Sequence, residues 1–273
     1  MLPTSLPLSP TVNVRWLLWP APQSIFRLAR ARVPPALICP MPSDWFNLEE
    51  LARQLGRDLR EIEKLVQRGR IPAHKRGGEW MFQSTEISQW LEQEMRSFSD
   101  AQLAAVERVQ QAPGINPTVP VTSYLRPEHV EVDLQARTKR SVLEGMIEVA
   151  GRTWKIWEPA VVLKAVQERE ELMSTAFENG VAIPHWRQPI PDAVGESLVA
   201  FGRTYGGIPF GASNNSLSDL FFLVICRDSK THLHILARLG RMLQRADFTE
   251  QLRDAPDAQA AFDVITAADR EIG

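Results

Sequence analysis

The sequence has few cysteines and no long apolar run. Its 273 residues include two cysteines, Cys39 and Cys226, which lie far apart, so it has neither a disulfide framework nor a CxxC metal motif. No stretch approaches the ~20 apolar residues that a membrane-spanning helix needs. The net charge of −2 excludes a uniformly basic nucleic-acid-binding protein. These absences favour a reduced, cytoplasmic chain without a membrane segment.

The length and composition are typical of a globular chain with two domains. Apolar residues make up 44% of the chain and charged residues 23%. The Pro-rich residues 1–43 lack a sustained period and predict a disordered extension. The apolar run at residues 16–19 is too short for a signal peptide, and Pro20 ends it. Alternatively, this extension is translated sequence upstream of a true start at Met41.

Residues 44–94 show the pattern of a small helical domain. Apolar residues recur at helical spacing over residues 46–55 and again over 59–66, with Gly56 between them. The pair Gly77-Gly78 lies between short strand-like runs and predicts a hairpin. A third helix then follows. The order resembles the excisionase/MerR-like winged helix-turn-helix family, on the motifs Leu48-Glu49-Glu50-Leu51-Ala52, Leu55-Gly56, Ile71-Pro72-Ala73, Gly77-Gly78-Glu79-Trp80 and Ile87-Ser88-Gln89-Trp90-Leu91.

This resemblance implies DNA binding through the second helix and the wing. The cations that would contact phosphates are Arg57, Arg60, Lys64 and Arg68 on one helix face, and Lys75 and Arg76 at the wing. Acidic residues share the same helix and dilute its positive field. A role in contacting protein rather than DNA therefore stays open.

Residues 95–120 pass from a charged helical stretch into sequence interrupted by proline and glycine. Pro113, Gly114, Pro117 and Pro120 break any period there. We predict that residues 95–120 form a linker.

Residues 121–273 alternate helical and strand-like patterns. Short apolar runs typical of buried strands occur at residues 198–201 and 220–225. Helical periodicity flanks them, as at residues 142–150 and 233–243. Alternation of this kind predicts an α/β domain built in layers.

Three polar segments of this second domain could carry chemistry. They are Glu168-Arg169-Glu170, the stretch from Ser174-Thr175 to Pro184-His185, and Thr231-His232-Leu233-His234. Phosphoryl transfer to a histidine needs a neutral imidazole nitrogen as nucleophile, and cations or donors around the transferred oxygens. A second imidazole and an arginine meet that need at neutral pH. Gly180 and Pro184 would bend and stiffen the loop, so that the ring of His185 is presented rather than buried.

The same residues carry a resemblance to a known family. Arg169-Glu170, Thr175 and Gly180-Val181-Ala182-Ile183-Pro184-His185 follow the pattern R-E-x(4)-T-x(4)-G-[IV]-A-I-P-H, and His232-Leu233-His234-Ile235-Leu236-Ala237 follows downstream. Residues 121–273 are thereby identified as a member of the IIA proteins of the bacterial phosphoenolpyruvate sugar phosphotransferase system, of the fructose/mannitol/nitrogen-regulatory type. The fold that this resemblance implies is a mixed β-sheet flanked by helices.

The resemblance implies a role for each matching residue. His185 would be the phosphoacceptor and His232 its partner imidazole. Arg169 would pair with the phosphoryl oxygens, and Thr175 would shape the loop. The donor would be a phosphorylated HPr-type carrier protein, a separate IIB protein could be the acceptor, and no cofactor is implied.

Two departures from the family pattern concern the rim of this site. Ala176 and Glu178 stand where the family has small residues, often glycine, and Trp186-Arg187 follow the histidine where a small residue is common. A bulky rim could alter which carrier docks, but it leaves the nucleophile in place.

Two other interpretations apply to this domain. His232 and His234 together with His185 could suggest a metal site, but residues two apart on a helix do not share a face, so no metal site is predicted. A non-catalytic alternative stays open, in which the IIA domain of a transcriptional regulator only binds partners. In the preferred interpretation, phosphorylation of His185 reports metabolic state to the helix-turn-helix domain or its partner.

Overall fold

A computed structural model describes residues 45–110, 119–245 and 247–272 of the chain. These residues all belong to one compact unit, Ser43–Gly273. The extension predicted for residues 1–43 lies outside the described residues, as does the part of the predicted linker from 111 to 118. No helix among the described residues is both long enough and apolar enough to cross a membrane.

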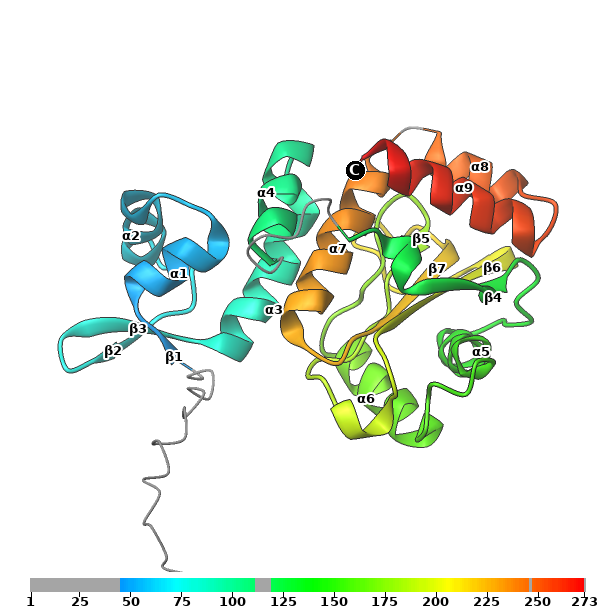
Figure 1. Cartoon of the computed structure of the whole chain (residues 1–273), viewed down its shortest axis with the longest axis horizontal. Helices are drawn as coiled ribbons and strands as arrows, with labels where there is room; N and C mark the ends of the chain where they lie inside the picture. Colours follow the sequence, from blue (N-terminus) through cyan, green and yellow to red (C-terminus); the bar gives the residue numbers. More distant parts are fainter. Residues whose placement is uncertain (1–44, 111–118, 246, 273) are drawn as a thin grey trace, which may run out of the picture. The chain divides into compact units, whose positions relative to one another are not determined.

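The first part of this unit is a helix-turn-helix followed by a hairpin (Figure 1). Asn47 and Glu50 form a capping box that starts the first helix, and Gly56 ends it in the left-handed region at φ 61°. The predicted hairpin turn has positive φ at both Gly77 and Gly78, as a tight two-residue turn requires. The elements are β1 (Trp45–Phe46), α1 (Leu48–Leu55), α2 (Leu59–Gln67), β2 (His74–Arg76), β3 (Glu79–Gln83) and α3 (Ser84–Glu94), with antiparallel strands in the order β1-β3-β2.

Part of the segment predicted as a linker is folded instead. Residues 95–110 contain η1 (Met95–Ser97) and α4 (Asp100–Gln110), and α4 lies along α7 (Ser229–Leu243) (Figure 1). Leu103 of α4 is buried, and a Cβ built on Gly240 of α7 would lie 3.2 Å from its Cδ1. The linker prediction therefore differs from the structure over these residues, because their apolar side chains are buried in a core.

The second part contains a mixed four-stranded sheet in the order β4-β6-β7-β5. Strands β4 and β6 are parallel, β6 and β7 are antiparallel, and β5 and β7 are parallel. The predicted α/β fold with a mixed sheet flanked by helices is confirmed. Its elements are η2 (Val121–Ser123), β4 (Leu125–Glu131), α5 (Lys139–Gly151), α6 (Pro159–Leu172), β5 (Val181–Ala182), η3 (Pro191–Ala193), β6 (Leu198–Ile208), β7 (Ser218–Ile225), α7, α8 (Phe248–Asp254) and α9 (Ala258–Glu271).

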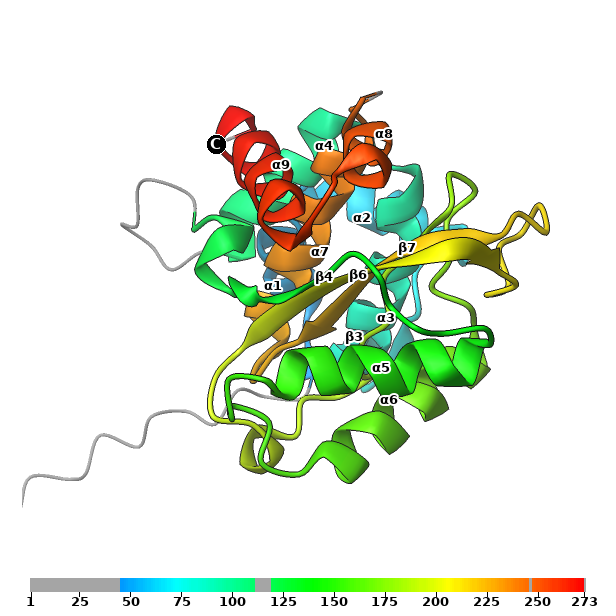
Figure 2. The same ribbon diagram turned by 90° about the vertical axis from the view of Figure 1, so that its right-hand side faces the viewer.

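Helices cover both faces of this sheet (Figure 2). Helices α5 and α6 pack on one face, and α7, α8 and α9 pack on the other. Alternate residues of β7 enter the two cores: Phe221 and Leu223 face α5 and α6, whereas Phe222 and Val224 face the opposite layer. The continuous apolar run of β7 is thus explained by burial on both faces.

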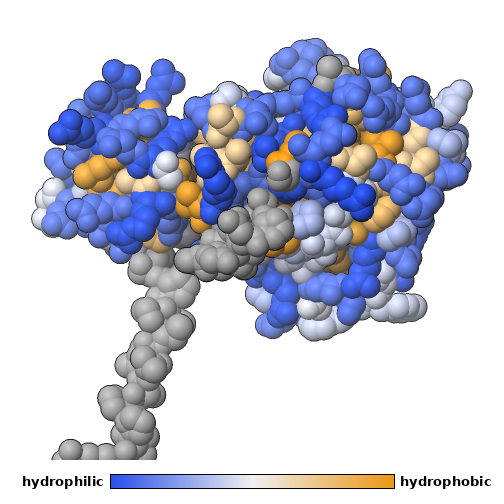
Figure 3. Space-filling view, turned by 45° about the horizontal axis from the view of Figure 1, so that its top comes forward, coloured by the Kyte–Doolittle hydropathy of each residue, from blue (hydrophilic) through white to orange (hydrophobic). Residues whose placement is uncertain are grey.

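Hydrophilic side chains dominate the face drawn in Figure 3, and hydrophobic ones show there as small separate groups. Beneath the surface, the core of the helix-turn-helix part extends beyond that part of the chain. Leu233 and Ala237 of α7 pack with the buried residues of α1, α3 and α4. Helix α7 therefore contributes residues to two hydrophobic cores: one that it shares with the sheet, and one that it shares with the helix-turn-helix part.

Candidate functional site

His185 follows the short strand β5 and is fixed against the end of β7. The amide of Val224 donates to the carbonyl of Pro184 over 2.9 Å. Within the ring, Nδ1 lies 2.8 Å from the carbonyl oxygen of Ile183. A carbonyl can only accept, so Nδ1 carries the hydrogen and Nε2 is the nitrogen that faces the site.

The loop leading to His185 depends on Gly180. Its φ is +87°, and a Cβ there would lie 2.5 Å from Nη2 of Arg253 and 2.9 Å from Oδ1 of Asp219. Glycine therefore avoids both backbone strain and a clash with an ion pair. His185 is 4% exposed, so its ring is buried. The sequence-based expectation that the loop presents this ring to solvent is therefore wrong.

His232 lies beside His185 at the start of α7. The two ring centroids are 4.9 Å apart, and Nδ1 of His232 finds no hydrogen-bond partner among the described residues. Burial, together with the charges of His185 and Arg169, lowers the pKa of His232 and favours the neutral ring, although hydrogen bonding to Glu92 opposes this. His234 points elsewhere, because its Nε2 lies 2.7 Å from the carbonyl of Val119.

Arg169 approaches the two imidazoles from the last turn of α6. Its Nη1 donates to the carbonyl of Met173 over 2.9 Å, which leaves Nη2 directed into the site. Thr175 is held by Glu170, which accepts from its amide and, over 2.6 Å, from its hydroxyl. The structure thus brings His185, His232, Arg169 and Thr175 together, and Glu170 takes up the amide and the hydroxyl of Thr175.

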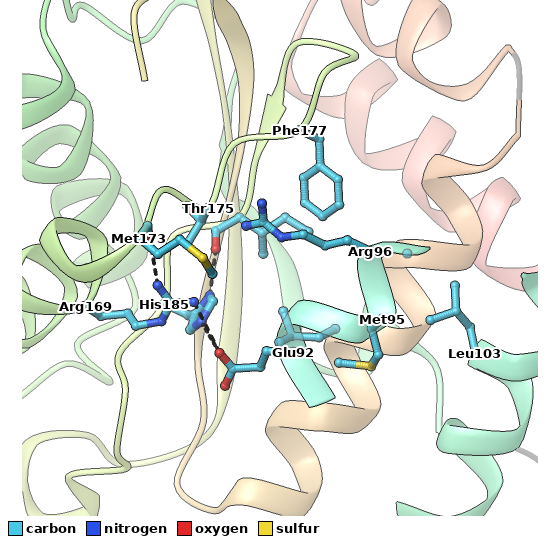
Figure 4. A pocket seen from close by; sticks show the side chains of 12 residues that line it. Glu92, Met95, Arg96, Leu103, Arg169, Met173, Thr175, Phe177 and His185 are labelled. Carbon is cyan, nitrogen blue, oxygen red and sulfur yellow. Dashed lines mark hydrogen bonds and ion pairs between the residues drawn. The ribbon is translucent and has the colours of Figure 1, made fainter. Parts of the chain in front are cut away.

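Glu92 of α3 completes the site, and sequence reasoning missed it (Figure 4). Its Oε2 lies 3.1 Å from Nε2 of His185 and 3.3 Å from Nη2 of Arg169, and its Oε1 lies 3.1 Å from Nε2 of His232. Burial alone would raise the pKa of Glu92, but the charge of His185 and hydrogen bonds from both imidazoles outweigh it. The pKa of this carboxyl is held well below its usual range.

A second arginine borders the same site. Arg96 of η1 donates to the carbonyl of Ser174 over 2.8 Å and to that of Ala176 over 3.3 Å, and it lies over the ring of Phe177. Burial and the nearby charge of Arg169 lower the pKa of Arg96. Arg96 and Arg169 line one cavity with Glu92 and His185. The charges of Glu170 and Glu92 both act on Arg96.

Three side chains of this site are of the types that bind metal ions. Glu92, His185 and His232 each offer one ligand atom, and these three atoms lie within 4.8 Å of one another. Two imidazoles with a carboxylate are ligands that zinc accepts. However, the guanidinium of Arg169 lies 3.3 Å from the same carboxylate. A dication would be repelled by that charge, so the surroundings of the two imidazoles favour an anion.

The cations predicted to contact DNA fall into three groups. Arg60, Lys64 and Arg68 are exposed on and just after α2. Arg57 precedes α2; it pairs with Glu61 over 3.0 Å and lies over the ring of Phe98, so its position on the face of α2 is corrected. The other two, Lys75 and Arg76, are exposed on β2 and lie over the rings of Trp80 and Trp45 respectively.

Comparisons with known proteins match both parts of the chain. The family described as "Phosphoenolpyruvate-dependent sugar phosphotransferase system, EIIA 2" matches residues 123–268, and "Helix-turn-helix domain" matches residues 45–95. A nitrogen regulatory protein of Bradyrhizobium diazoefficiens is 31% identical over 149 residues, which cover 54% of this chain and 95% of that protein. The fructose-specific EIIABC component of Bacillus subtilis is 26% identical over 152 residues, which cover 55% of this chain but 24% of that protein.

Among solved structures, the nitrogen regulatory protein IIA-Ntr from Neisseria meningitidis aligns with a TM-score of 0.48 at 24% identity, covering 53% of this chain and 98% of that one. Beside the mixed sheet of this chain, two imidazoles and an arginine converge on one carboxylate, that of Glu92. Because the EIIA 2 match spans more than half of the chain, the protein belongs to the type-2 EIIA family of the phosphotransferase system, with a helix-turn-helix domain before the EIIA domain. That membership supports a phosphocarrier role.

Proposed function

We propose that the EIIA domain is a histidine phosphocarrier that accepts a phosphoryl group on His185 from an HPr-type carrier protein. The observation that carries the proposal is the ring orientation. Nδ1 donates to the carbonyl of Ile183, so the lone pair that can act as a nucleophile is on Nε2, beside Arg169 and His232. Phosphoenolpyruvate is the ultimate donor in this scheme, which places the protein in the cytoplasm.

The transfer is a substitution at phosphorus. Nε2 of His185 forms the new N–P bond while the N–P bond to the carrier's phosphohistidine breaks, and the carrier's imidazole leaves with the electron pair. Arg169 and the N–H of His232 would stabilise the negative charge on the transferred oxygens. A IIB protein would then receive the phosphoryl group: its own nucleophile would form a new bond to phosphorus while the N–P bond to His185 breaks, and His185 would keep the electron pair.

Replacing His185 by alanine should abolish acid-labile phosphate on this protein. The full chain would be incubated with enzyme I, an HPr-type carrier and labelled phosphoenolpyruvate. The matched control is His74→Ala, which removes an exposed histidine of the wing and should leave labelling unchanged. Labelling of the His185→Ala variant at the wild-type level would exclude this nucleophile.

A second proposed function is DNA binding by the helix-turn-helix domain. It is favoured by the exposed row formed by Arg60, Lys64 and Arg68, with Lys75 and Arg76 exposed on β2. Phosphate contacts by such cations release counterions, so the affinity should fall with salt. If this function fails, the domain is a protein-contacting module.

The double substitution Arg60→Ala with Lys64→Ala should weaken binding to a mixed-sequence DNA duplex. Losing two phosphate contacts should lower the magnitude of the slope of log K against log[salt] by about 2. Fluorescence anisotropy over a salt series measures this slope, and Arg53→Ala, an exposed cation of α1, serves as the control. An unchanged slope would show that α2 does not contact the phosphates.

A further inference from the structure

The carboxylate of Glu92 occupies the place where a phosphoryl group on His185 would lie. Its two oxygens receive the three groups that face the site, Nε2 of His185, Nε2 of His232 and Nη2 of Arg169, over 3.1 to 3.3 Å (Figure 4). These are the same groups that would hold the oxygens of a phosphoryl group on Nε2. A carboxylate of the chain's own α3 thus satisfies an anion site built in the EIIA domain.

This contact also takes up the nucleophilic lone pair. Nδ1 of His185 faces a carbonyl oxygen and Nε2 faces a carboxylate oxygen, and both acceptors require a hydrogen on the nitrogen. While Nε2 is engaged with this carboxylate, it has no free lone pair with which to attack phosphorus. The strongly lowered pKa of Glu92 is consistent with an ionised carboxylate in this contact.

The segment that carries Glu92 is anchored around the site at several points. Arg96 donates to Ser174 and Ala176 on the loop before β5, and Gln89 accepts from Arg187 over 3.1 Å. On α4, Asp100 pairs with Arg241 of α7 over 2.7 Å. His185 and His232 are 4% and 6% exposed. A carrier protein cannot bring its phosphohistidine to Nε2 while α3 lies there.

We propose that helices α3 and α4 form an autoinhibitory cover of the EIIA site, with Glu92 as an internal mimic of the phosphoryl group. The inference rests on the proposed phosphocarrier function. The phosphoryl group on Nε2 carries about −2 charges and needs the volume that the carboxylate fills, so docking of Glu92 and phosphorylation of His185 exclude each other. The coupling is reciprocal: docking of Glu92 disfavours phosphorylation of His185 by the same free energy by which phosphorylation disfavours docking.

Replacing Glu92 by glutamine should speed phosphorylation of His185. Glutamine keeps the size of the side chain but removes its negative charge. One carboxylate oxygen becomes an NH2 group, which cannot accept hydrogen bonds from the imidazoles or from Arg169. Losing charged hydrogen bonds of this kind should raise the rate of labelling about 10- to 100-fold. The matched control is Glu94→Gln, which removes the same charge from an exposed position two residues further along α3, and its rate should equal that of the wild type.

Hydrogen exchange gives a second measurement that does not depend on this variant. After phosphorylation of the wild-type chain, amides of α3 and α4 should exchange faster, while His185→Ala treated in the same way should show no change. Equal labelling rates for wild type and Glu92→Gln, or unchanged exchange in α3 and α4 of the labelled protein, would overturn the cover. If an active carrier labels neither wild type nor Glu92→Gln, the phosphocarrier function fails instead.

Discussion

Replacing Arg238 by alanine should lower the free energy of unfolding by about 3–5 kcal/mol, because it removes a buried guanidinium that pairs with two buried carboxylates. Arg238 lies on α7 and is 1% exposed. Its Nε donates to Oδ1 of Asp269 over 2.5 Å and its Nη1 donates to Oε1 of Glu107 over 2.8 Å. Asp269 lies on α9 and Glu107 on α4, so this one guanidinium joins three helices.

The carboxylates that remain would keep some compensation. Asp269 still accepts from the amide and hydroxyl of Thr122, and Glu107 still pairs with Arg241 over 2.6 Å. These contacts limit the loss but do not replace two charged hydrogen bonds to groups that are 0% and 1% exposed.

Urea denaturation of the full chain would measure the loss. Arg245→Ala is the control, because Arg245 makes an exposed ion pair with Glu271 and its removal should cost less than about 1 kcal/mol. A loss for Arg238→Ala as small as the control's would mean that solvent reaches and stabilises Asp269 and Glu107 once the arginine is gone. Because Glu107 lies on α4, the variant should also loosen α4 from α7.

The features that sequence predicted correctly are those that depend on neighbours in the chain. Gly56 and the pair Gly77-Gly78 lie where the backbone needs positive φ. These glycines therefore predicted where the first helix ends and where the hairpin turns. The apolar run 220–225 predicted a buried strand, and β7 is buried throughout it. The histidine motif likewise lies within one loop, and the family resemblance that it predicted is confirmed by the EIIA 2 match over residues 123–268.

The features that were missed depend on packing between distant segments. Residues 95–110 were predicted as part of a linker because Pro113 and Gly114 follow them, yet Leu103 and Val106 are buried with α7. Arg57 was placed on a helix face, although it packs on Phe98, which lies 41 positions further along the chain. A helical wheel cannot anticipate a partner outside its own helix.

Glu92 is the largest omission of this kind. It lies on the same short helix as Glu94, and no local pattern tells the buried carboxylate from the exposed one. What separates them is the position of α3 across the loop that holds His185, 93 residues away. The burial of His185 has the same origin: the loop does present the ring, but it presents it to α3.

Replacing Arg169 by alanine should slow phosphoryl transfer to His185 about 10²- to 10³-fold, the range for removing one preorganised donor to developing negative charge. The guanidinium is already oriented, because Nη1 donates to the carbonyl of Met173 and Nη2 points at the anion position. Little reorganisation is then needed during transfer. Lysine at this position should recover only part of the rate. Its ammonium lacks the two forked NH2 groups with which the guanidinium contacts the Met173 carbonyl and the anion position at the same time.

The comparison is best made in the Glu92→Gln background, because Arg169 also contacts Glu92 in the covered site. In the wild-type background, losing Arg169 would weaken the cover and the transfer together, and the two effects on rate would oppose each other. With the cover weakened beforehand, single-turnover labelling reports the loss of charge stabilisation alone. Arg126→Ala, an exposed arginine paired with Glu196, provides the control. If Arg169→Ala then labels as fast as the control, Arg169 is a docking partner of Glu92 and has no part in the transfer.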